Sequence, residues 1–260
     1  MKKKLICTIL TLVFTCGLVF GIYQICDILQ EYEEGTDAYE DLGEYIELPD
    51  ASEDPEGAKA PSETQSESGE TDESSIWPQV DFEALKSVNS DIVGWIYLES
   101  SEINYPIAQS EDNSYYLKHL FDRSSNSSGC IFLDCRNDSG FSDRHSILYG
   151  HHMKNGTMFS GLDAYKAQEY YDAHPTILLM TPDRNYEIEI FAGYVASVKE
   201  DAWQVGFESD ADFKEWLVRA IDRSCFDSGI FPVVTDRIVT LSTCSYEFDN
   251  ARFVLLGILR

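Results

Sequence analysis

An uninterrupted apolar segment near the start of the chain is the feature that most constrains its structure. Residues 5–26, LICTILTLVFTCGLVFGIYQIC, contain no charged side chain and follow the basic end MKKK. A helix of about 20 apolar residues is long enough to span a bilayer. Few helices of globular proteins are apolar on every face over such a length. The segment therefore predicts a transmembrane helix at 5–26, with residues 1–4 as a cytoplasmic basic end.

The flanks of this segment favour a signal anchor, with a cleavable signal peptide as the alternative. The apolar run exceeds the ~7–15 residues usual for the core of a signal peptide, and no small-x-small cleavage site follows it. A lipoprotein site at Cys16 is disfavoured because Phe14 and Thr15 precede it where small residues are required. Lysines before the helix and acids after it predict that the rest of the chain lies outside the cell membrane.

The formal net charge of −27 is unevenly distributed along the 260 residues. Between Asp27 and Trp77 there are eighteen acidic residues and one lysine, so this part carries −17 of the total. Such a distribution argues against a nucleic-acid-binding face. Residues 27–77 predict an acidic extracellular stalk that is largely disordered, with some helix up to about Leu48 where Tyr, Leu and Ile still occur.

Residues 78–260 show many short runs of β-branched and aromatic residues, bounded by Gly, Pro, Asp or Asn. A short helix is predicted after the capping residue Asp81. A longer one is predicted over 209–224, where Ser209 is the cap and apolar residues recur at helical spacing. Many strands and few helices indicate a mainly β domain, a closed or nearly closed β-barrel. The helices lie at its N-terminal side and before the strand that ends in a cysteine.

That cysteine is Cys244, at the end of RIVTLSTC, and Arg252 begins the next apolar strand eight positions later. If the two strands pair antiparallel, the guanidinium lies beside the thiol. Ser242 shares a strand face with Cys244. Of the other cysteines, Cys130 and Cys135 are about 17 Å apart along one strand, too far for a disulfide. A reactive thiol and an ordinary strand-end cysteine are both compatible with this pattern.

A thiol needs a base or a cation nearby to become nucleophilic at neutral pH. Of the five histidines, His119, His145 and His174 have ordinary surface or turn contexts. His151 and His152 follow Gly150 at the end of an apolar strand. Adjacent strand residues point to opposite faces, so at most one of the two can approach Cys244. A zinc site that uses both is disfavoured for the same reason.

Several motifs together resemble the sortases, the cysteine transpeptidases of Gram-positive bacteria. These are TLSTC followed by an arginine, YGHHM followed by GTMF, and the N-terminal anchor. DIVGWI, INYPIAQ, YYLKHLFD, GCIFLDCR and the helix at 209–224 resemble the class B branch in particular. The resemblance covers essentially all of 78–260 and does not extend to the acidic stalk.

The resemblance implies an eight-stranded β-barrel in which Cys244 is the nucleophile, His151 the catalytic histidine and Arg252 the oxyanion-stabilising arginine. His152 would be structural. Ser242 and Asn104 would line the peptide groove.

The reaction that the resemblance implies is cleavage after Thr in the C-terminal sorting motif of a secreted protein. The acyl group would pass through a thioester to a peptidoglycan amine, and no metal or organic cofactor would be needed. Three alternatives stay open at this point: a pilin polymerase that uses a Lys acceptor, a hydrolytic cysteine peptidase, and an anchored binding module without activity.

Overall fold

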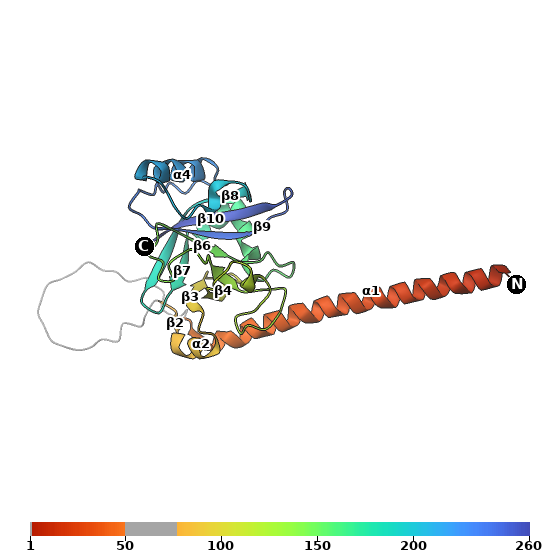
Figure 1. Cartoon of the computed structure of the whole chain (residues 1–260). Helices are drawn as coiled ribbons and strands as arrows, with labels where there is room; N and C mark the ends of the chain where they lie inside the picture. Colours follow the sequence, from red (N-terminus) through yellow and green to blue (C-terminus); the bar gives the residue numbers. More distant parts are fainter. Residues whose placement is uncertain (1, 50–76) are drawn as a thin grey trace, which may run out of the picture.

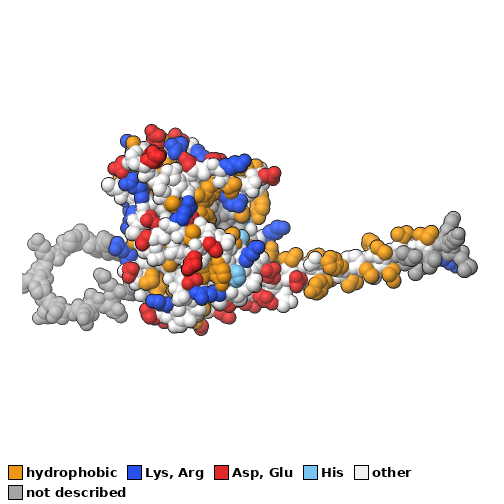
Figure 2. Space-filling model, viewed as in Figure 1, with side chains coloured by type: hydrophobic (Ala, Val, Ile, Leu, Met, Phe, Trp, Pro, Cys, Tyr) orange, Lys and Arg blue, Asp and Glu red, His pale blue; other side chains and the backbone are white. Residues whose placement is uncertain are grey.

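The computed structural model describes residues 2–49 and 77–260. A β-barrel lies at one end of a long helix, α1 (Lys2–Asp41), whose N-terminal part projects away from the barrel (Figure 1). Among the described residues, one helical stretch, Leu10–Tyr45, is long and apolar enough to cross a membrane, and its most apolar window has a mean hydropathy of 1.9. Figure 2 shows hydrophobic side chains exposed along this projecting part. The helix is consistent with the predicted membrane anchor.

The barrel is closed and has eight strands in the order β10-β8-β7-β3-β4-β5-β6-β9. This confirms the predicted architecture. The β4–β5 and β6–β9 pairs are parallel and the other pairs are antiparallel. The strands are β3 (Ile92–Tyr97), β4 (Asn104–Ala108), β5 (Ile131–Leu133), β6 (His145–Tyr149), β7 (Thr176–Met180), β8 (Asn185–Ser197), β9 (Ile238–Cys244) and β10 (Ala251–Leu259).

Aliphatic and aromatic side chains fill the barrel interior, and Ile107, Leu148, Leu241 and Leu255 are fully buried there. A second apolar cluster lies outside the barrel, where α4 (Asp210–Asp222) covers β8 and β10. Ser209 caps α4 by accepting a hydrogen bond from the Asp212 N–H at 3.2 Å. The predicted helix before the cysteine-bearing strand is therefore confirmed, together with its cap.

Short elements connect the strands. At the short helix α2 (Phe82–Val88) the predicted cap is confirmed, since Asp81 accepts a hydrogen bond from the Ala84 N–H at 2.9 Å. The remaining elements are η1 (Leu42–Tyr45), β1 (Ile46–Glu47), β2 (Gln79–Val80), α2 (Phe82–Val88), η2 (Tyr115–Leu117), η3 (Phe159–Lys166), α3 (Gln168–Ala173) and η4 (Asp201–Trp203).

The first part of the predicted stalk contains the expected helix, and it also packs on the barrel, which was not predicted. Helix α1 continues unbroken past the apolar run to Asp41. Leu42 and Ile46 are buried, and β1 pairs with β2. The physical reason is a one-sided apolar face whose burial outweighs the repulsion among the acids on the other side. The rest of the predicted stalk, 50–76, lies outside the described residues.

Candidate active site

Cys244 and Arg252 are direct partners in the antiparallel pairing of β9 with β10. The Ser245 N–H donates to the Ala251 carbonyl at 3.0 Å, which makes Ser245 and Ala251 the hydrogen-bonded pair of the ladder. Cys244 and Arg252 are therefore a non-hydrogen-bonded pair, whose Cα atoms lie about 4.5 Å apart with the side chains close together. The antiparallel pairing that the sequence suggested is present.

His151 follows β6, which lies beside β9 in the parallel pair of the barrel. Its Nε2 lies 2.8 Å from the Leu117 carbonyl oxygen. Because a carbonyl can only accept, Nε2 carries the proton, and Nδ1 is the nitrogen left for proton exchange. The preceding Gly150 is required by packing, since a Cβ there would lie 2.6 Å from the Phe159 ring.

The neighbouring His152 is directed elsewhere, as the alternation of strand residues predicts. Its Nε2 lies 2.9 Å from Asp163 Oδ2, and its ring meets Tyr246 edge to face with centroids 5.3 Å apart. One histidine of the pair therefore approaches the cysteine side, while the other takes part in a polar cluster on η3.

A groove of about 630 Å³ opens at this end of the barrel, and Cys244, His151, Arg252 and Ser242 all line it. The structure thus brings together the three residues proposed for catalysis and one of the two proposed for binding. The other lining residues include Asn113, Leu117, Phe132, Tyr149, Trp203 and Gln204. A groove with apolar and aromatic walls and a few polar groups suits a peptide.

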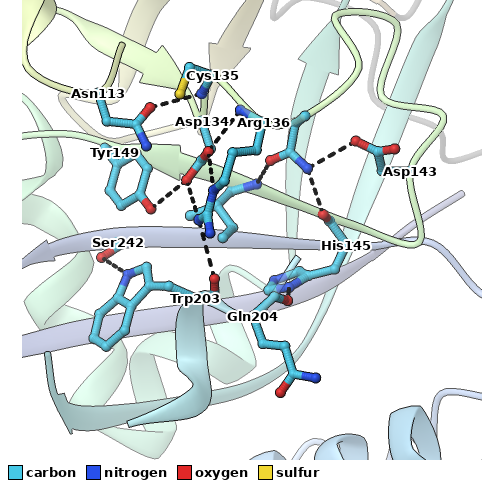
Figure 3. A network of polar contacts seen from close by, with 12 residues as sticks. Asn113, Asp134, Cys135, Arg136, Asp143, His145, Tyr149, Trp203, Gln204 and Ser242 are labelled. Atoms are coloured by element: carbon cyan, nitrogen blue, oxygen red, sulfur yellow. Dashed lines mark hydrogen bonds and ion pairs between the residues drawn. The ribbon is translucent and has the colours of Figure 1, made fainter. Parts of the chain in front are cut away.

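Trp203 forms one wall of the groove, and three contacts hold it in place (Figure 3). Its indole Nε1 donates to Ser242 Oγ at 3.0 Å, and its carbonyl accepts from Arg136 Nη2 at 3.3 Å. The next residue, Gln204, accepts at its carbonyl from the Nδ1 of His145 at 2.7 Å. Ser242 therefore supports the wall as well as lining the groove.

The arginine of that network is anchored by Asp134, whose side chain is fully buried directly after β5. Arg136 Nη2 lies 2.7 Å from Asp134 Oδ2, and the groove residue Tyr149 donates to the same oxygen at 2.9 Å. Burial alone would raise the pKa of Asp134, but these hydrogen bonds hold it at about 2. This support was not predicted from the sequence. The sequence feature that could have indicated it is an acid directly after an apolar run, followed two positions later by an arginine.

His145 is buried in β6, so the expected surface or turn context is wrong. Its Nε2 lies 2.7 Å from Thr240 Oγ1, and burial lowers its pKa to about 4. The ring is therefore neutral at physiological pH, with Nδ1 donating to Gln204 and Nε2 accepting from the Thr240 hydroxyl. Both partners are distant in sequence, so local pattern could not reveal this burial.

Asn104, proposed for the peptide groove, lies elsewhere. Its Oδ1 accepts from Trp95 Nε1 at 2.7 Å, and it lines a separate cavity of about 270 Å³ between α1 and the barrel. In the barrel order β5 and β6 separate β4 from β9, and Asn104 is not among the residues that line the groove with Cys244. An asparagine does line the groove, namely Asn113, whose Oδ1 accepts from the Cys135 N–H at 2.8 Å. The sequence feature that could have pointed to Asn113 is its position just before the helical turn that supplies Leu117.

A cysteine thiol flanked by an imidazole and a guanidinium can attack an acyl group, exchange a proton and stabilise an oxyanion. At the open mouth of a closed β-barrel, beside a groove for an extended chain, this arrangement defines a cysteine transpeptidase.

The chain belongs to the sortase family. A family model described as a sortase domain matches residues 96–259. Sortase B of Listeria monocytogenes is 39% identical over 175 residues, which are 66% of this chain and 71% of the relative. Sortase B of Staphylococcus aureus is 36% identical over 178 residues, which are 68% of this chain and 73% of the relative.

Solved structures agree with this assignment. Sortase B from Bacillus anthracis in complex with AAEK1 matches with a TM-score of 0.71 and 31% identity, over 89% of this chain and 99% of that one. A Staphylococcus aureus sortase B–substrate complex matches with a TM-score of 0.66 and 35% identity, over 69% of this chain and 84% of that one. The class B resemblance is confirmed, and the chain is a transpeptidase of the type that anchors proteins to the cell wall.

Proposed function

We propose that Cys244 cleaves the C-terminal sorting motif of secreted proteins after Thr and carries the acyl group to a peptidoglycan amine. His151 acts as the acid and base, and Arg252 stabilises the oxyanion. The observation that carries this proposal is the direct pairing of Cys244 with Arg252 in a groove that His151 also lines. The match to a sortase B–substrate complex supports a polypeptide as the occupant of the groove.

In the first step the Cys244 thiolate attacks the carbonyl carbon of the threonine. The tetrahedral intermediate collapses as the C–N bond breaks, and His151, as imidazolium, gives the Nδ1 proton to the leaving amine. In the second step an acceptor amine attacks the thioester, and His151 takes up its proton. The C–S bond breaks, the thiolate is regenerated, and a new amide joins the protein to its acceptor.

Two donors beside the sulfur are candidates for the oxyanion, and both are engaged. The Ala251 carbonyl accepts from Arg252 Nη1 at 2.8 Å and from the Ser245 N–H at 3.0 Å. Only Nη1 of the guanidinium makes this bond, so its remaining N–H groups can donate to the developing oxyanion while the bond is kept. Loss of one such donor typically costs about 3–4 kcal/mol of transition-state stabilisation.

The proposed location follows from α1. Its apolar part spans the cell membrane once, with the basic end inside and the catalytic domain outside, where secreted proteins and peptidoglycan precursors both occur. Lysines 2–4 and the acids that follow residue 26 support this orientation.

The test uses the purified full chain in detergent, a labelled sorting peptide and a diaminopimelate-type amine. We expect transfer to the amine, a thioester on Cys244 in intact-mass spectra, and loss of both with Cys244→Ala. Tyr246→Phe, on the exposed loop after the cysteine, is the control for a substitution near the site that leaves the thiol in place. Preference for a pilin lysine would indicate a polymerase, and hydrolysis at high amine concentration a peptidase. Activity retained by Cys244→Ala would overturn the proposal.

A further inference from the structure

Helix α1 contacts the loop that supports the active-site histidine. Tyr39 of α1 donates its hydroxyl to the Gly129 carbonyl at 2.6 Å. Its ring packs edge to face on Tyr105, with centroids 5.2 Å apart. The juxtamembrane helix is thereby joined to residues 115–130, which connect η2 to β5.

Gly129 separates Tyr39 from His151. It has a φ of +60°, and a Cβ placed on it would lie 3.0 Å from His151 Cδ2 and would clash with the Tyr116 carbonyl. A glycine is therefore needed both for the left-handed backbone and for the close approach to the ring. The residue whose carbonyl Tyr39 holds is therefore the same one whose lack of a Cβ leaves room for the His151 ring.

The same loop holds the other side of the imidazole, since Leu117 accepts from His151 Nε2. The loop is closed on itself by hydrogen bonds from the Cys130 N–H to the Tyr116 carbonyl at 2.9 Å and from the Asn126 N–H to the Lys118 carbonyl at 3.0 Å. The Leu117 carbonyl and Gly129 are thus parts of one unit, and a shift of one is felt by the other.

Further contacts clamp α1 to this unit. Glu31 accepts at its carbonyl from Asn126 Nδ2 at 2.9 Å, and its carboxylate accepts from the Ser127 N–H at 2.8 Å. Gly35 lets the helix approach closely, since a Cβ there would lie 2.7 Å from Ser128 Oγ. Among these residues of α1, Tyr39 is the one that bonds to Gly129, the residue next to His151.

We propose that Tyr39 is a positioning residue for His151 and acts through Gly129. The inference rests on the proposed acid–base role of His151. The phenol holds the Gly129 peptide in place, so the ring is fixed at Cδ2 by packing and at Nε2 by the Leu117 carbonyl, and Nδ1 stays directed at the reacting groups. The anchor helix thereby takes part in the geometry of the active site.

The experiment is Tyr39→Phe in the full chain, which removes the hydroxyl and keeps the ring. We expect kcat to fall about three- to tenfold, the effect of one hydrogen bond, with KM unchanged because the groove is untouched. In ring ¹H–¹³C spectra the His151 resonance, assigned with His151→Gln, should shift. The resonances of His152 and His174 should stay in place.

The matched control is Tyr32→Phe, the same change on the same helix, at a ring that packs on the barrel core. It should leave kcat and the His151 resonance unchanged. The spectra report on folded molecules, so lower stability of a variant does not imitate the effect. An unchanged kcat and His151 resonance in Tyr39→Phe would overturn the inference. Full activity of His151→Gln would instead remove the proposed function on which it rests.

Discussion

Cys244 and Arg252 face each other across two adjacent strands, so backbone hydrogen bonds of the barrel set the distance between sulfur and guanidinium. Because both residues belong to strands of the barrel, no loop has to move to bring the thiol and the guanidinium together. The imidazole differs in this respect, because the residues that hold His151 come from a loop and, through Tyr39, from α1.

Replacing Arg252 tests the oxyanion role. We expect Arg252→Ala to lower kcat about 100- to 1,000-fold with little change in KM, since the guanidinium acts mainly on charge that develops in the transition state. Arg252→Lys should fall between, because it keeps the charge and loses the planar fork. Steady-state kinetics with the sorting peptide measures both. A rise in KM at constant kcat would instead assign Arg252 to substrate binding.

Two asparagines provide a matched comparison. Asn113→Ala should lower kcat/KM about fivefold or more, because it removes a polar group from the groove together with the bond that holds the Cys135 N–H. Asn104→Ala should leave the transfer kinetics unchanged but cost about 1–3 kcal/mol in stability, because the buried Trp95 indole loses its acceptor. Urea unfolding and peptide kinetics on both variants decide the matter. The reverse pattern would restore Asn104 to the groove.

The buried His145 predicts acid sensitivity in a defined window. Its pKa is lowered to about 4 by burial, against 6.5 for the exposed group. The unfolded chain therefore binds a proton first as the pH falls. The contribution is intact above pH 6.5 and is lost progressively toward pH 4, by roughly 3 kcal/mol. His145→Gln should flatten this part of the stability curve in chemical unfolding from pH 7 to pH 4. An unchanged slope would mean that the ring is not the titrating group.

Asp134→Asn tests the support of the groove wall. The buried carboxylate accepts from both Tyr149 and Arg136, and the amide can replace only part of this. We expect a loss of about 1–3 kcal/mol, less than for a fully buried ion pair because Arg136 is half-exposed. Trp203 should become more mobile, which its fluorescence anisotropy would show. Wild-type stability with an unchanged indole signal would contradict a supporting role.

The features that the sequence made predictable are those encoded locally. Alternation along 237–244 and the spacing to Arg252 predict both the strand pair and the approach of thiol and guanidinium, and the cap at Ser209 predicts α4. Some helix up to about Leu48 was predicted, but its packing on the barrel was not, because the acids of 27–49 conceal an apolar face of Tyr32, Tyr39, Leu42 and Ile46 at helical spacing. Which asparagine reaches the groove depends on how distant strands close the barrel, which no short pattern contains.

The unbroken course of α1 limits what the enzyme can reach. Glu31, the first residue of the helix bonded to the barrel, is five positions beyond Cys26, a rise of about 7.5 Å. The turn between β9 and β10 lies on the side toward which α1 projects (Figure 1). With α1 inserted in a bilayer as proposed, a continuous helix joins the domain to the membrane, and no flexible linker lies between them. The active site is then held in a thin layer just above the lipid head groups, at a fixed height and with a fixed tilt of the domain.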